Sequence, residues 1–229
     1  MAKLTNDEDG SRSYRGLTRE ERLTDRLDRM LEAGLQLFGT RGYGAVSISD
    51  VCQVAQVSRS AFYNQIGTLE SLLMKVVSAI DERAFEHAGA VLAASPDESF
   101  GVRAERALRA YMSVTCADTR TARVCYVEIV GVSDAVEEWR GHRRELFVSV
   151  LAGEACRGIA RGELPDRDYR YTALAAVGAV NSLAHEWLVT HDSDAAVELD
   201  RIAAELSHVV VASVIQPIGD RSLLSRRET

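Results

Sequence analysis

The sequence predicts an all-α protein of about nine helices, with a small N-terminal helical unit followed by a larger helical bundle. Apolar residues recur at steps of three and four along most of the 229 residues, as they do on the buried face of a helix. No segment shows the strict alternation of apolar and polar residues that is typical of a half-buried strand. Each of the three prolines, Pro96, Pro165 and Pro217, falls at an expected helix boundary.

The first helix is predicted from a regular apolar stripe. Gly42 can adopt the left-handed conformation that ends a helix, so the helix should stop near Thr40-Arg41-Gly42. The stripe consists of Leu23, Leu27, Met30, Leu31, Gly34, Leu37 and Phe38.

Two short helices and a tight turn follow. Ser47 can cap the second helix, with Asp50 three residues later in its first turn. Gln56-Val57 forms the turn, and Ser58 caps a third helix over residues 59–65. A pair of short helices at a fixed angle is the arrangement that places side chains in a DNA major groove.

The remaining helices are bounded by capping and breaking residues. A fourth begins after Gly67-Thr68 and ends at Ser95-Pro96-Asp97, and a fifth spans 98–115. A sixth opens at Asp118-Thr119, and a seventh runs from Ser133-Asp134 to Gly162. An eighth follows Pro165-Asp166 to about residue 190, and a ninth, preceded by Asp192 to Asp194, ends at Pro217. These boundaries divide the chain into a basic-containing arm at 1–20, a small helical unit at 21–80, a larger helical bundle at 81–218 and a polar tail at 219–229.

The stretch from Ser47 to Leu73, with the helix before it, resembles the N-terminal domain of the TetR family of bacterial regulators. The residues that carry the resemblance are Ala33, Leu37, Phe38, Gly42, Tyr43, Ser47, Ile48, Asp50, Val51, Ala55, Val57, Ser58, Phe62, Tyr63, Glu70 and Leu72. The resemblance covers about a quarter of the chain without a gap. It implies a homeodomain-like three-helix DNA-binding domain and a cytoplasmic homodimer that reads a pseudo-palindromic operator. It also implies a repressor that a small-molecule effector releases from DNA.

Four positions depart from the family pattern. Gln56 replaces a turn glycine, Ala61 replaces a small hydroxyl residue, and Ile66 replaces a phenylalanine. Leu69 stands where the family has a lysine against DNA phosphate, and its loss would lower the salt dependence of binding. The alternative is that Leu69 opens the apolar stripe of the fourth helix, which continues through Leu72, Leu73, Val76, Val77 and Ile80.

The predicted DNA contacts divide by chemistry. Ser47, Ser58 and Thr68 lie at helix N-termini, where amides and hydroxyls bind phosphate, and the resemblance gives Tyr63 a phosphate contact. Arg59 suits guanine and Asn64 suits adenine, with Ser60 beside them. The N-terminal arm carries four arginines, Arg12, Arg15, Arg19 and Arg22. Such an arm can reach a neighbouring DNA groove, and the alternative is a solvated tail. Residues 1–65 carry nine basic and nine acidic residues, so the net charge of −7 lies in the rest of the chain and DNA binding must rely on local placement of cations.

The last two helices predict a dimer. The segment 173–180 is apolar on every side, so one face serves the subunit and the other a partner. Small residues allow close approach of a second helix, and the alternative is a monomer with a deeply buried eighth helix. The interface candidates are Ala175, Gly178, Ala179, Ser182, Leu206 and Val210.

The resemblance implies a DNA-binding domain at 21–80 and a ligand-binding and dimerisation domain at 81–218, with a ligand pocket between the DNA-binding domain and the dimer face. Bulky side chains (Phe85, Tyr111, Tyr126, Trp139, Phe147 and Trp187) and polar ones (Glu128, His142, Asn181 and His185) are its candidates, although each is equally suited to an ordinary core or surface position. Cys52, Cys116, Cys125 and Cys156 have no metal-binding spacing and are expected to be free thiols, with a redox pair of Cys116 and Cys125 as the alternative. We predict no metal, no cofactor and no membrane span, since Asn181, His185 and Glu186 interrupt the most apolar helix.

Two other functions compete with an effector-controlled repressor. A DNA-organising or protein-assembly factor of the same fold would need no effector. An all-α enzyme is less consistent with the sequence, because no nucleophile elbow, phosphate loop or metal motif accompanies His142, His185 or His191. Operator sequence, effector and the sign of regulation are not predicted.

Overall fold

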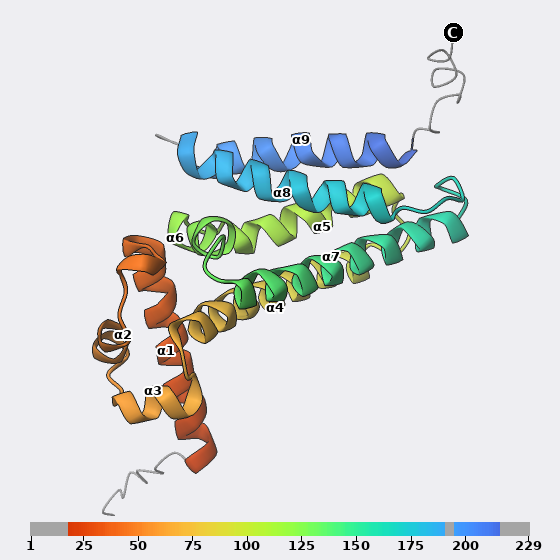
Figure 1. The fold of residues 1–229 in the computed structure, drawn as a ribbon. Helices are drawn as coiled ribbons and strands as arrows, with labels where there is room; N and C mark the ends of the chain where they lie inside the picture. Colours follow the sequence, from red (N-terminus) through yellow and green to blue (C-terminus); the bar gives the residue numbers. More distant parts are fainter. Residues whose placement is uncertain (1–17, 191–194, 216–229) are drawn as a thin grey trace, which may run out of the picture.

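A small N-terminal helical domain sits at one end of the molecule, and a helical bundle forms the rest (Figure 1). The computed structural model describes residues 18–190 and 195–215. Within these ranges the chain forms nine α-helices and no strand, which confirms the predicted fold class. The arm with Arg12 and Arg15, the segment Asp192 to Asp194 and the tail 219–229 lie outside the described residues.

The first helix, α1 (Arg19–Arg41), begins with a capping box in which Thr18 and Glu21 satisfy each other's backbone amides. It ends at Gly42, whose φ of 84° only glycine adopts easily, so the predicted stop is confirmed. A short 3₁₀ turn, η1 (Tyr43–Ala45), leads to the second helix.

The helix-turn-helix consists of α2 (Ile48–Ala55) and α3 (Arg59–Gln65). Ser47 and Asp50 form a second capping box, and Ser58 caps α3, both as predicted. Gln56 ends α2 with a φ of 54° and a ψ of 47°, the left-handed conformation that a glycine would adopt at lower cost. The Arg29 guanidinium donates to the Ala55 carbonyl at 2.9 Å and to the Gln56 carbonyl at 3.3 Å, so α1 holds this turn in place.

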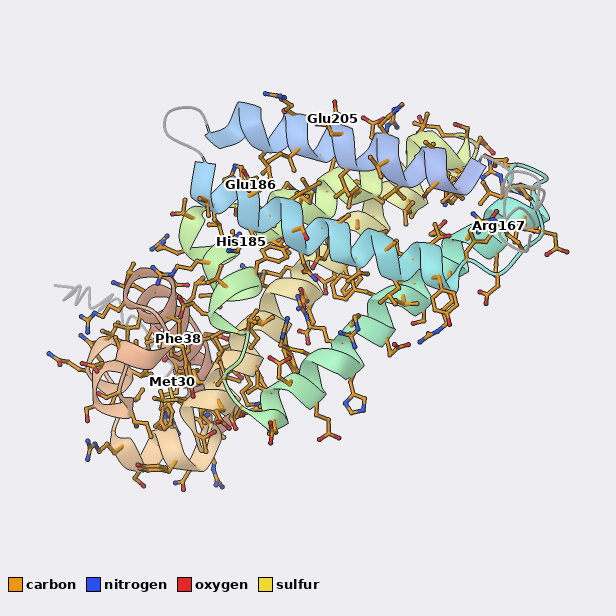
Figure 2. All side chains as sticks on the ribbon, turned by 45° about the horizontal axis from the view of Figure 1, so that its top comes forward. Met30, Phe38, Arg167, His185, Glu186 and Glu205 are labelled. Carbon is orange, nitrogen blue, oxygen red and sulfur yellow. The ribbon has the colours of Figure 1, made fainter. Side chains whose placement is uncertain are left out.

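Apolar side chains from all four N-terminal helices meet in one core. Met30, Phe38, Phe62 and Leu72 are fully buried there, and Figure 2 labels the first two inside the small domain. Leu69, at the start of α4 (Leu69–Ala94), is half-buried and packs against this core. The apolar-stripe interpretation of Leu69 is therefore the one that the packing supports.

The C-terminal bundle contains α5 (Phe100–Thr115), α6 (Thr119–Arg123), α7 (Asp134–Ala160), α8 (Arg170–Thr190) and α9 (Ala195–Ile215). In Figure 1, α8 and α9 lie along one side and α4 and α7 cross beneath them. Helix α8 begins later than Pro165-Asp166 predicts, because residues 165–169 form a bend in which the Tyr169 hydroxyl donates to the Pro165 carbonyl.

The predicted sixth helix is not one regular helix. After α6 the chain continues as a π-helical turn, Val124–Glu128. Such turns accommodate an extra residue and often mark functional positions. Here the turn buries Cys125 and Tyr126 in the bundle and leaves Glu128 facing the small domain.

Candidate DNA-binding face and ligand cavity

The exposed face of α3 carries the four polar residues that the sequence predicts for base and phosphate contacts. Arg59, Ser60, Tyr63 and Asn64 are exposed, while Phe62 on the opposite side is fully buried. Tyr63 is 55% exposed and stacks edge-on against Phe62, with ring centroids 6.0 Å apart. The phenol is thus held at its base while its hydroxyl stays available for a phosphate.

Three capping hydroxyls surround this face. Ser47, Ser58 and Thr68 are exposed, and each accepts a backbone amide of its own helix at 3.0 to 3.2 Å. The Arg59 guanidinium donates to the Ser49 hydroxyl on α2, which orients it across the helix-turn-helix. Arg22 lies exposed on α1, beside the same domain.

Glu128 joins the small domain to the bundle. It does not line the cavity, so its prediction as a pocket residue is wrong. Its carboxylate accepts the Tyr43 amide at 2.6 Å and the Arg123 guanidinium at 2.7 Å. The π-helical turn directs Glu128 toward η1 rather than into the cavity. Nearby, Gly39 of α1 meets Arg120 of α6 so closely that an added Cβ would lie 2.8 Å from the Arg120 Cα.

A cavity of about 540 Å³ lies inside the bundle, within the range of small-molecule sites. Five helices contribute to its wall, mainly with apolar side chains. Of the predicted pocket residues, Tyr111, Tyr126, Asn181 and His185 lie on this wall, together with Phe85 and Phe147. His185 is near the end of α8 that approaches α6 (Figure 2).

Three further pocket predictions are corrected. His142 is exposed on α7, and Trp139 and Trp187 pack in the protein core without reaching the cavity. All three were chosen for size or polarity alone, whereas the rotation of each helix decides which side chains face the cavity. A simple signal was available, since Arg140, Arg144, Phe147 and Leu151 fall on one face of α7 and all line the cavity.

A buried polar cluster lies behind the cavity wall, and two of its members, Arg143 and Tyr111, line the cavity. Asp81 of α4, 6% exposed, accepts hydrogen bonds from Arg143 of α7 and, at 3.1 Å, from the Tyr111 hydroxyl of α5. Burial alone would lower the pKa of Arg143, but the hydrogen bonds and charge of Asp81 outweigh it and hold that pKa above its ordinary value. Burial also raises the pKa of Tyr111 and of Tyr126. The Arg143 guanidinium therefore stays charged at neutral pH, and both phenols stay protonated.

The predicted dimer residues do not share one face. Ala175, Gly178 and Ser182 are exposed on α8, and Ala179 is half-buried beside them. Ser182 also lines the cavity. Leu206, only 1% exposed, belongs to the subunit's own core, and Val210 lines the cavity. These two are corrected, because the apolar stripe of α9 packs inward on α5 and α8. Tyr171 and Val189, 80% and 70% exposed, extend the α8 set instead.

The thiols are free, as predicted. Cys52, Cys116 and Cys125 are buried and Cys156 is exposed. Burial raises the pKa of Cys116 to about 12 and raises that of Cys125 as well, so neither forms a reactive thiolate at neutral pH. In the part of the chain that is described, no group of three His, Cys, Asp or Glu side chains is placed to hold a metal. No helix in those same ranges combines the length and apolar content needed to cross a bilayer.

An exposed polar recognition helix, held by a helix-turn-helix and joined to a hollow helical bundle, defines the class of DNA-binding transcriptional regulators. Residues 30–73 match the family model described as bacterial regulatory proteins, tetR family. Residues 30–73 therefore form a helix-turn-helix domain of the TetR type, and a helical domain follows it.

Solved structures share the fold along most of both chains. FadR from Bacillus subtilis, in complex with stearoyl-CoA, is 15% identical, covers 81% of this chain and 97% of its own, and has a TM-score of 0.69. A regulator from Syntrophomonas wolfei is 16% identical, covers 82% and 96%, and has a TM-score of 0.71. A regulator from Saccharomonospora viridis in complex with choline is 16% identical, covers 85% and 100%, and has a TM-score of 0.67. No curated protein matches the sequence.

Proposed function

We propose that this protein is a repressor that binds its operator as a homodimer through α3 and is released when a small molecule occupies the cavity. The single observation that carries this proposal is the placement of α4. Its first turns pack in the core of the DNA-binding domain, and its later residues Phe85, Ala88 and Leu92 line the cavity. One helix therefore belongs to both sites.

DNA reading is supported by the chemistry of the exposed α3 face. Arg59 can donate two hydrogen bonds to guanine N7 and O6, and Asn64 can pair with adenine. Tyr63 and the hydroxyls of Ser47, Ser58, Ser60 and Thr68 suit phosphate oxygens, which fix the register of a protein on the duplex. Arg22 adds a cation on the same domain.

A homodimer is supported by the outer face of α8. Tyr171, Ala175, Gly178, Ser182 and Val189 recur at helical spacing and are all exposed. An isologous contact along this stripe would pair two α3 helices about a two-fold axis, which suits a pseudo-palindromic operator. The small side chains at its centre allow two backbones to approach closely.

Release of DNA is supported by two contacts that bridge the parts. The Asp81–Arg143 pair joins α4 to α7 behind the cavity wall, and Glu128 joins the π-helical turn to η1. The same turn places Cys125 and Tyr126 on the cavity wall. A ligand that fits only one arrangement of these contacts shifts the population of that arrangement and so changes DNA affinity.

The two relatives solved with stearoyl-CoA and with choline support a small-molecule effector. Their ligands belong to different chemical classes, so the side chains of this cavity determine which class of effector fits it.

The test is a genome-wide footprint of the protein in the cell, with Asn64→Ala as the DNA-contact variant and Gln53→Ala, an exposed change on α2, as the control. We expect one or a few strong sites that Asn64→Ala removes and Gln53→Ala retains. Many scattered sites of similar strength would instead indicate a DNA-organising factor. An unchanged footprint for Asn64→Ala would contradict the role of α3.

A further inference from the structure

The cavity is long rather than round. On α7 its lining runs from Arg140 to Ala155, a length of about 22 Å at the rise of an α-helix. Tyr169 and Phe100 stand at the far end, and Tyr126 and His185 stand at the end nearest the DNA-binding domain. Between them the wall is formed mostly by Ala, Val, Leu and Phe side chains. Such a cavity fits an extended alkyl chain.

Charge on the wall is one-sided. Four arginines line the cavity, Arg103, Arg140, Arg143 and Arg144, against the single acid Glu154. This contrasts with the net charge of −7 for the whole chain. Glu154 is already engaged, because Arg103 and Arg157 both bind its carboxylate.

The four arginines are not equally available. Arg143 is held by buried Asp81, and Arg103 donates to the Leu92 and Ser95 carbonyls as well as to Glu154. Arg140 binds only Glu137, a half-exposed partner three residues away on α7. Arg144 is exposed and makes no hydrogen bond or ion pair within the described ranges. Exposed ion pairs contribute little, so an arriving anion can displace Glu137.

The mouth of the cavity lies beside these two arginines. Arg144 is one turn from Phe147 and two turns from Leu151, which is 37% exposed although it lines the cavity. Val130 and Val150 are likewise lining residues that remain exposed, at 52% and 41%. An apolar interior thus opens to solvent next to two cations, Arg140 and Arg144.

The same wall is not suited to bind a cationic ligand. The rings of Phe85, Tyr111 and Phe147 pack on one another, with centroids 4.6 to 5.7 Å apart, and the Arg143 guanidinium already lies 5.2 Å from the Phe147 centroid. No aromatic cage is left open for an ammonium group on this part of the wall. Repulsion from the arginines acts in the same direction.

Building on the proposed effector cavity, we infer that its ligand is an anionic amphiphile. An unbranched alkyl chain lies along α5, α7 and α8, and the anionic group is bound by Arg140 and Arg144 at the mouth. A long-chain carboxylate and a long-chain acyl thioester of coenzyme A share this chemistry. The carboxylate would place its own charge on the arginines, whereas the thioester would place a phosphate there.

Calorimetric titration of the full-length protein tests this inference with ligands of matched chain length below their micellar concentrations. The probes are dodecanoate, dodecanoyl-CoA, dodecanol and dodecyltrimethylammonium. We expect dodecanoate, dodecanoyl-CoA or both to bind roughly tenfold or more tightly than dodecanol, with the ammonium weakest. Which of the two anions binds better identifies the source. Binding of dodecanol as tight as that of the anions, or preference for the ammonium, would overturn the inference.

Variants separate the mouth from the chain site. Arg140→Gln/Arg144→Gln should weaken anion binding roughly tenfold and leave dodecanol unchanged. Arg170→Gln is the matched control, because Arg170 is an exposed cation that joins α8 to Glu145 of α7 without lining the cavity. An equal loss for the anions and the alcohol in the double variant, with helical content intact by circular dichroism, would also overturn the inference.

The outcome is independent of the regulatory proposal. Selective anion binding with no change in operator affinity would retain the ligand class and refute release by that ligand. Release of DNA by a cation or a neutral compound that displaces no bound anion would support effector-controlled release and refute the anionic ligand class.

Discussion

Among single residues, Gln56 adopts a left-handed backbone conformation that is strained for a residue with a side chain. A glycine at this turn would avoid that strain. The residue ends α2 with positive φ, and its carbonyl is held by Arg29. A side chain in this conformation costs roughly 1 kcal/mol relative to glycine. The turn is retained because the core on either side of it, with Val51 and Phe62 fully buried, fixes α2 and α3.

Replacing Gln56 by glycine should raise the free energy of unfolding by about 0.5 to 1 kcal/mol, because the strain is removed while part of the gain is lost to backbone entropy. Urea unfolding followed by circular dichroism measures the change. Gln53→Gly, an exposed position inside α2, is the control and should lower stability by about 1 kcal/mol. Equal destabilisation by both variants would show that Gln56 is not strained.

The thiols give a second prediction at the residue scale. Native protein should expose one fast-reacting thiol to Ellman's reagent, Cys156, because the other three are buried and carry raised pKa values. Unfolded protein should show all four. Cys156→Ser should remove the fast phase, and a fast phase that persists in this variant would revive a thiol-sensing role for Cys116 and Cys125.

At the scale of elements, α4, α5 and α7 meet around one buried ion pair. Asp81 has its partners on two other helices, and Arg143 reaches it from the cavity wall. Removing one member of such a pair leaves an uncompensated charge, whereas removing both leaves an apolar contact. The pair therefore stabilises a particular arrangement of helices rather than the fold as a whole.

Asp81→Asn should lower the free energy of unfolding by roughly 3 kcal/mol, because Arg143 stays charged and buried. The double variant Asp81→Leu/Arg143→Met should lose clearly less than the single one, and denaturant unfolding of both variants provides the comparison. Losses that add across the two positions would mean that the pair does not act as a unit.

The helix boundaries could be predicted from local sequence rules. The positions of the site residues could be predicted only in part. Ser47, Ser58 and Gly42 fixed helix ends because capping depends on neighbouring residues alone. The face of α3 was also predictable, since Phe62 must be buried and its neighbours must then be exposed. Glu128 and Leu206 were misplaced because their orientation depends on a π-helical turn and on how α9 packs, which a single sequence does not encode locally. The position of the α7 arginines on the cavity wall was not predicted, because charged residues on a helix usually lie on the solvated surface.

At the level of the whole molecule, the proposed dimer would form through the exposed stripe on α8 and would present two copies of the short helix α3 to DNA. Gly178 lies at its centre, and a Cβ added there would meet nothing within 4 Å in the same subunit. A Cβ at this position therefore causes no steric clash within the subunit, so we expect loss of dimerisation in such a variant to come from a clash with a second copy.

Gly178→Arg should convert a dimer to a monomer, as measured by analytical ultracentrifugation, while helical content is kept or slightly raised. Gly89→Arg makes the same change at another exposed helical glycine with open space around it, on α4, and should stay dimeric. A dimeric Gly178→Arg protein would place the interface elsewhere.

The proposed function requires that α3 reads a specific operator. Fluorescence anisotropy with the DNA that flanks its own gene, at two salt concentrations, tests it most directly. We expect tight, salt-sensitive binding that exceeds binding to a scrambled duplex by roughly 10³-fold or more. Equal binding to both duplexes, or no binding to either, would contradict it.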